Sequence, residues 1–180
     1  TGRVGGGDSV EVEWVARYRL KEVTGEKRTT GVNPCVLNGR SRVTFTNGNH
    51  ITFVSHGETT LLSEKGKLKL QSHLDREEYV ARVLDREAKS TPPEAAKAMT
   101  VAIRTFLQQN ANREGDCLTI PDSSATQRVS ASPATTGART MTAWTQELIY
   151  AGDPVHYHGS RATEGTLSWR AATAQAGKGE

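Results

Sequence analysis

The chain has 180 residues, of which 35% are apolar and 24% are charged, and its net charge is +3 at pH 7. This size suits one domain with a modest core, and the composition is too apolar for an intrinsically disordered chain. The weak positive charge includes no block of Lys and Arg, which argues against nucleic acid and favours a partner with scattered carboxylates. No apolar run approaches the roughly 20 residues that a membrane-spanning helix needs.

Residues 1–72 are predicted to form a mainly β N-terminal region. Apolar and polar residues alternate over residues 10–20, which is typical of a half-exposed strand. The segment 41–55 consists of two β-rich runs around Asn47-Gly48, a strong hairpin signal, and residues 59–72 repeat this pattern. We therefore expect antiparallel hairpins throughout this region.

A first helix is predicted from LDREEYVARVLDREA, residues 74–88, with Asp75 as its N-cap. Its apolar residues from Tyr79 to Leu84 follow a helical spacing, and the next member of this stripe is Glu87. We expect an acid at this position to face the protein interior, which makes Glu87 a candidate proton donor. The alternative is a helix-terminal glutamate that is solvated or paired with an arginine.

A second helix is predicted to follow the double proline at residues 92–93, with Thr91 as its N-cap. Lys97 and Arg104 are seven residues apart in this helix. They therefore project within about 20° of each other, away from the apolar face. They form either a cationic surface for an anionic or polar ligand or the solvated side of an amphipathic helix.

The remaining sequence carries weaker signals. Residues 121–140 are rich in Ser, Thr and Ala, and a structureless loop of this length is often functional or mobile. Residues 141–159 predict a short helix or turn and then a C-terminal β-hairpin. The overall prediction is one compact α+β domain with a helical region over residues 73–170 and a disordered tail over residues 171–180.

Cys35 and Cys117 are the two cysteines of the chain. They are either bridged, which indicates an oxidising compartment, or two unpaired thiols. Neither has a second cysteine nearby, which excludes a zinc ribbon. His156 and His158 share one face of a predicted strand, but a third ligand is not evident. We therefore expect no metal and no other cofactor.

The two predicted helices resemble the central motif of the stage II sporulation protein D (SpoIID/LytB) family, which acts on the bacterial cell wall. The resemblance rests on Tyr-Val-x-x-Val-x-x-x-Glu at residues 79–87 and on EAAKAMTVAIRTF at residues 94–106. It continues more weakly through PDSSATQRV at 121–129 and TQELIYAGDPV at 145–155. The resemblance implies a lytic transglycosylase that cuts glycan strands free of stem peptides.

The family's functional residues can be carried over by position. Its essential glutamate falls on Glu87, its motif lysine and arginine on Lys97 and Arg104, and its loop glutamine on Gln127. The C-terminal motif of the family is compressed here in HYHGSRATEGTLSW, residues 156–169, where Tyr157 and Ser160 are the candidates for substrate binding.

The resemblance also implies a mechanism. Glu87 protonates the glycosidic oxygen between N-acetylmuramic acid and N-acetylglucosamine, and then removes the proton of the muramic 6-hydroxyl, giving a 1,6-anhydro product. Lys97 or Arg104 pairs with the lactyl carboxylate of the sugar, or Arg104 holds Glu87 in place, and Gln127 orients the sugar.

Two other functions remain open at this stage. A family member with a degenerate motif would bind peptidoglycan glycan or stimulate an amidase without cutting. A cell-envelope protein-interaction module would instead use the N-terminal β region to contact another envelope protein. All three functions predict a secreted or periplasmic location, and the start at Thr1 is expected of a processed or trimmed chain.

Overall fold

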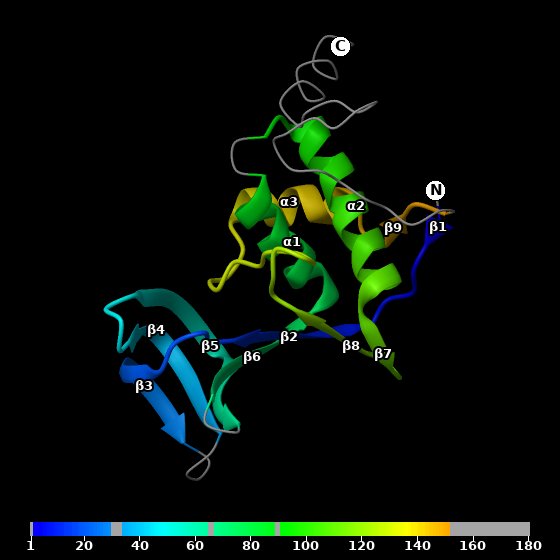
Figure 1. Ribbon diagram of the computed structural model, residues 1–180. Coiled ribbons are helices and arrows are strands. Elements are labelled where there is room, and N and C mark those ends of the chain that lie inside the picture. The colour runs from blue at the N-terminus through cyan, green and yellow to red at the C-terminus, as the bar shows by residue number, and fades with distance from the viewer. Residues whose placement is uncertain (1, 30–33, 65–66, 89–90, 152–180) are drawn as a thin grey trace.

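The computed structural model describes residues 2–29, 34–64, 67–88 and 91–151. These residues form an α+β fold, in which a seven-stranded sheet carries three helices (Figure 1). The strands of this sheet are β2 (Ser9–Val15), β3 (Leu20–Thr29), β4 (Cys35–Phe45), β5 (His50–Glu64), β6 (Lys67–Asp75), β7 (Asn112–Glu114) and β8 (Cys117–Pro121). The helices are α1 (Arg76–Glu87), α2 (Pro93–Asn110) and α3 (Thr136–Trp144). The fold class predicted from the sequence is thereby confirmed.

The sheet has the strand order β3-β4-β5-β6-β2-β8-β7. Every pair from β3 to β2 is antiparallel, as expected for the N-terminal region. After α1 and α2, the chain returns to the sheet and β8 joins β2 in parallel, with Val10 opposite Leu118. This parallel pairing, which ties the two halves of the sequence together, was not predicted.

The alternating segment 10–20 is not one strand. β2 ends at Val15 and β3 begins at Leu20, on the far edge of the sheet. Ala16 in the bend between them is buried, whereas Tyr18 and Leu20 are exposed. The alternation of apolar residues therefore continues past the strand without marking burial.

β5 is bent in its middle, and this bend positions a charged residue. Gly57 has a φ of 92°, and the pairing with β4 skips residues 57 and 58. Glycine adopts this left-handed conformation without the steric cost that a Cβ atom would add. The bulge brings Glu58 to α1, where its Oε1 lies 3.0 Å from Nη2 of Arg82.

The apolar side chains form two core clusters along the sheet. One lies between the helices and strands β2, β6 and β8, and includes Val10, Leu74, Ile103 and Leu118. The other lies in the curled β3-β4-β5-β6 part and is formed by Ala16, Leu37, Val43, Phe45, Phe53, Leu68 and Leu70. Figure 1 shows the three helices over the β2, β6 and β8 end of the sheet, away from β3 and β4.

The N-termini of α1 and α2 can be compared with the N-cap residues predicted from the sequence. Asp75 caps α1 as predicted, because its side chain accepts a hydrogen bond from the backbone N–H of Glu78 at 3.0 Å. The prediction for α2 is wrong by one residue, since Pro92 and not Thr91 occupies the N-cap position. Of the helices that the structure describes, none is long and apolar enough to cross a membrane.

Of the two alternatives for Cys35 and Cys117, the structure has the unpaired thiols and not the bridge. Cys35 lies on β4 and Cys117 on β8, four strand positions apart in the sheet. Four strand spacings amount to about 19 Å, whereas the Cα atoms of a disulfide are usually about 4.4–6.8 Å apart.

Of the predicted C-terminal hairpin, only β9 (Leu148–Ile149) lies within the described residues, and it pairs with β1 (Gly2–Arg3).

Candidate active site

The segment between β8 and α3 is ordered by carboxylates, contrary to the structureless loop expected there. Glu87, Asp85 and Glu78 of α1 each accept a hydrogen bond from a backbone N–H of the segment. The donors are Arg128, Thr135 and Ala134, at distances of 3.0, 2.7 and 2.9 Å. Three carboxylates of α1 therefore hold residues 128–135 in place.

Glu87 is the last residue of α1 and is half-buried. Its Oε1 accepts the hydrogen bond from the backbone N–H of Arg128. The adjacent Arg86 and the same Arg128 both line a cavity between the sheet and residues 128–132. Glu87 is not among the residues that line this cavity, but its chain neighbour Arg86 and its hydrogen-bond donor Arg128 are.

The cavity beside Glu87, which we call the inner cleft, has a volume of about 410 Å³. Its lining combines the apolar Trp14, Phe53 and Leu70 with the charged Arg86, Asp122 and Arg128. A second cavity of about 920 Å³, the outer hollow, shares Trp14, Ile51, Asp122 and Arg128 with the inner cleft. Both volumes fall within the roughly 300–1,000 Å³ of typical ligand sites.

Asp122 lies where the inner cleft and the outer hollow meet. Its side chain is 20% exposed, and its Oδ1 accepts a hydrogen bond from the backbone N–H of Val129 at 3.3 Å. Burial raises the pKa of this carboxyl, and the negative charge of Glu87 adds to the effect. The N–H of Val129 and the guanidinium groups of Arg128 and Arg86 oppose this rise without cancelling it.

Lys97 and Arg104 do share one face of α2, but this face is not solvated. Lys97 Nζ lies 2.6 Å from Glu94 Oε1 and 4.5 Å from the ring centroid of Trp144 at the end of α3. Of the two expected environments, neither describes Arg104, which is buried where α3 and β9 pack against α2, whereas the side chain of Lys97 is 23% exposed. Within the described residues, neither cation pairs with Glu87.

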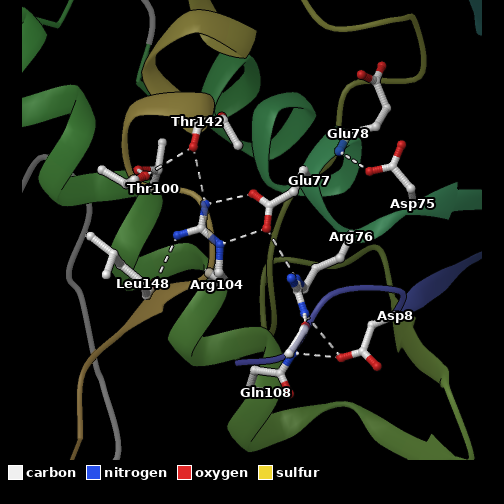
Figure 2. A network of polar contacts seen from close by, with 12 residues as sticks. Asp8, Asp75, Arg76, Glu77, Glu78, Thr100, Arg104, Gln108, Thr142 and Leu148 are labelled. Carbon is white, nitrogen blue, oxygen red and sulfur yellow. Dashed lines mark hydrogen bonds and ion pairs between the residues drawn. The ribbon is translucent and has the colours of Figure 1, made fainter. Parts of the chain in front are cut away.

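Arg104 is fully buried, and Figure 2 shows its guanidinium enclosed by protein groups. Its Nε and Nη2 donate to the two carboxylate oxygens of Glu77 at 3.1 and 2.7 Å. Its Nη1 donates to the carbonyl of Leu148 in β9 at 2.8 Å. Arg104 therefore joins α1, α2 and β9, and it holds Glu77 where the sequence suggested Glu87.

Gln127 is also fully buried. Its Oε1 accepts a hydrogen bond from the hydroxyl of Tyr79 at 2.7 Å, and its Nε2 donates to the carbonyl of Ile103 at 3.2 Å. Through these two buried hydrogen bonds, Gln127 links the residue that precedes the 128–135 segment to α1 and to α2.

The sequence of the central region matches a known family. Residues 64–149 match the family model SpoIID, described as stage II sporulation protein. This part of the chain is therefore similar to the SpoIID family. A relative from Escherichia coli (strain K12), "Uncharacterized protein YfaQ", is 90% identical over 178 residues, which are 99% of this chain. The chain spans 32% of that relative's length. No solved structure matches the chain.

The SpoIID match includes Glu87, Asp122 and Arg128, but it leaves out most of the sheet that forms the opposite wall of the inner cleft. Tyr157 and Ser160, the remaining candidates for substrate binding, and His156 and His158 lie outside the described residues. Among the residues that the structure describes, no group of three or more His, Cys, Asp or Glu side chains could hold a metal ion.

No functional role was assigned from the sequence to three residues of the inner cleft, Trp14, Arg86 and Asp122. Trp14 was expected only as one of the apolar residues of a half-exposed strand. Asp122 was noted as part of the family resemblance only. Only the three-dimensional structure brings these residues together, because they come from β2, α1 and the segment after β8, which all line the inner cleft.

Proposed function

We propose that this chain is a peptidoglycan-cleaving unit of the lytic transglycosylase type, acting on glycan strands free of stem peptides. The observation that carries the proposal is the half-buried carboxyl of Glu87, which the N–H of Arg128 holds next to the inner cleft that Arg128 and Arg86 line, in a segment that matches the SpoIID family model. Lytic cleavage needs one acid that first donates and then accepts a proton, so a single well-held carboxyl suffices.

In this reaction Glu87 donates a proton to the glycosidic oxygen, and the bond from this oxygen to C1 of the muramic residue breaks. The resulting carboxylate then takes the proton of the 6-hydroxyl, whose oxygen bonds to C1 and forms the 1,6-anhydro ring. Glu87 ends in its starting protonation state, and no water is consumed. The hydrogen bond from the N–H of Arg128 fixes the position of the carboxyl throughout.

The cation for the lactyl carboxylate comes from the cleft itself in this proposal. Arg128 is 47% exposed, and it lines the inner cleft together with Arg86. A guanidinium contacts a carboxylate through two parallel hydrogen bonds, which contribute about 1.5–3 kcal/mol when shielded and less at this exposure. Arg104 and Gln127 support catalysis from within, by fixing the helices and the segment that carry Glu87 and Arg128.

Digestion of stem-free glycan with the Glu87→Gln variant tests the proposal. We expect the wild-type chain to release anhydro-ended fragments and the variant to lose about 10²–10⁴-fold of this rate, the usual contribution of a general acid. The amide side chain of the variant retains an oxygen that can accept the hydrogen bond from the N–H of Arg128, so the thermal unfolding of the two proteins should coincide. Fragment release is measured by mass spectrometry.

Glu94→Gln is the matched control, because Glu94 is 61% exposed on α2 and pairs only with Lys97 among the described residues. It should cut at the wild-type rate. Full activity in Glu87→Gln would remove Glu87 from the mechanism and end this proposal.

A second function is favoured by one observation. The carboxylate of Glu87 anchors the backbone of the 128–135 segment, and its neighbouring cations differ from those that the family resemblance implied. A non-catalytic member that binds glycan or stimulates an amidase needs Glu87 only as a structural anchor of this segment. Both functions place the chain in the bacterial envelope, in a secreted or periplasmic location. Glycan binding without fragments from the wild-type chain would identify the second function.

A further inference from the structure

The outer hollow lies against a part of the chain that the SpoIID match does not include. Of its lining, only residues 121–124 and 128 fall within residues 64–149. The rest comes from β2, from the bend after it and from the β4–β5 turn, and includes Trp14, Tyr18 and His50. With about 920 Å³, this cavity is larger than the inner cleft.

The outer hollow continues directly from the inner cleft. Trp14 and Ile51 on the sheet side, and Asp122 and Arg128 on the opposite side, line both cavities. A polymer that binds in the inner cleft can therefore extend into the outer hollow past these four shared residues.

The lining of the outer hollow suits a particular kind of polymer. Trp14 presents a half-buried ring, and Tyr18 is 50% exposed, although large aromatic rings are usually withdrawn from water. Such rings pack well against the C–H face of a pyranose, which is flat and apolar. Arg17 and Arg128 add two guanidinium groups that can bind carboxylates.

We infer that the outer hollow is an additional sugar-binding subsite, in which Trp14 and Tyr18 bind the continuation of a carboxylate-bearing glycan strand. This inference rests on the proposed function for the position of the cut. In this assignment the N-terminal β region favours the binding of glycan strands that are longer than the inner cleft alone can hold. Tyr18 and Arg17 are specificity-determining residues in this assignment, and neither takes part in bond cleavage.

The test measures binding of purified stem-free glycan fragments to the Glu87→Gln variant, in which turnover is expected to be about 10²–10⁴-fold slower. Isothermal titration compares an octasaccharide with a tetrasaccharide. Tyr18→Ala should weaken the binding of the octasaccharide about tenfold, the size expected for loss of one aromatic contact. Binding of the tetrasaccharide should change less than twofold, because the inner cleft holds it.

Tyr150→Ala is the matched control, since Tyr150 is 47% exposed and lies outside both cavities. Trp14→Ala should weaken octasaccharide binding more than Tyr18→Ala does, and circular dichroism checks its fold because Trp14 also contacts Phe45. A chitin octasaccharide, which lacks lactyl carboxylates, should bind less tightly than the muramic-acid-containing one.

The outcome separates this inference from the proposed function. Length-dependent, Tyr18-dependent binding in a chain whose wild type cuts nothing would support the subsite and contradict the transglycosylase. Equal loss for both fragment lengths, or no loss in Tyr18→Ala, would overturn the subsite even if the wild type cuts glycan.

Discussion

Arg128 connects the two carboxyl groups of the site at the level of single residues. Its backbone N–H binds Glu87, and its guanidinium lies 3.9 Å from Asp122 Oδ1. Asp122 and Glu87 also interact through their charges, which contributes to the raised pKa of Asp122. A site with two carboxyls in different environments can keep one protonated while the other is charged.

Substitution of Asp122 by Asn tests this electrostatic account. The folded-state pKa of Asp122 lies above its ordinary value of 3.8. Its stabilising contribution is therefore fully present below the unfolded-state pKa and is lost as the pH rises through the folded-state pKa. The side chain of Asn stays neutral and can still accept the N–H of Val129. We expect Asp122→Asn to gain free energy of unfolding relative to wild type as the pH rises from 3.8.

Urea denaturation of both proteins across a pH series measures this difference. Glu78→Gln is the opposite control, because burial would raise the pKa of Glu78 but its contacts with Arg139, the N–H of Ala134 and Arg82 lower it below 4.5. This variant should lose stability relative to wild type as the pH rises. An Asp122→Asn difference that is flat or inverted with pH would contradict the assignment.

At the scale of elements, the pair formed by Glu77 and Arg104 fixes α2 against α1. Arg104 has no exposed side-chain area, whereas Glu77 is 26% exposed. Loss of one partner of a buried pair costs about 3–5 kcal/mol, because the other charge remains buried without compensation. We expect Glu77→Ala to lower the free energy of unfolding by about 2–4 kcal/mol, less than that range because Glu77 retains contact with water.

Chemical denaturation of Glu77→Ala provides the measurement. Glu94→Ala removes the more exposed pair with Lys97, and it should cost less than about 1 kcal/mol. Equal losses in the two variants would mean that the buried position of Arg104 does not depend on Glu77.

The sequence predicted local elements well and their partners poorly. Asp75, the stripe from Tyr79 to Leu84 and Asn47-Gly48 act within a few residues, and the elements that they predict are present. The environment of Arg104 depends on β9 and α3, which lie about 40 residues later in the chain. Helical spacing correctly grouped Lys97 with Arg104, but it does not show which neighbour covers their common face.

The 128–135 segment shows the same limit for the candidate site. Its small polar residues predicted a loop without regular structure, of a kind that is often functional or mobile. The sequence does not reveal that carboxylates of α1 accept its backbone N–H groups. Glu87 was found from its place in the apolar stripe and from the family resemblance. Arg86, Asp122 and Trp14 became recognisable as site residues only when β2, α1 and β8 were placed together.

At the scale of the whole molecule, the two core clusters share one sheet, and the inner cleft lies between them. Val10 and Leu74 belong to the N-terminal β region, yet both pack in the cluster under the helices. The expected boundary near residue 72 therefore separates secondary structure types within what we propose to be one cooperative unit. The proposed cut requires this arrangement, because the sheet supplies one wall of the cleft and α1 supplies the acid.

The central claim is that Glu87 cuts glycan with the muramic 6-hydroxyl as its nucleophile and without water. Digestion of stem-free glycan in water enriched in ¹⁸O, followed by mass spectrometry of the fragments, tests this claim most directly. The account predicts anhydro-ended fragments without label from the wild-type chain and none from Glu87→Gln. Fragments with ¹⁸O-labelled reducing ends, or intact strands after digestion by the wild-type chain, would contradict it.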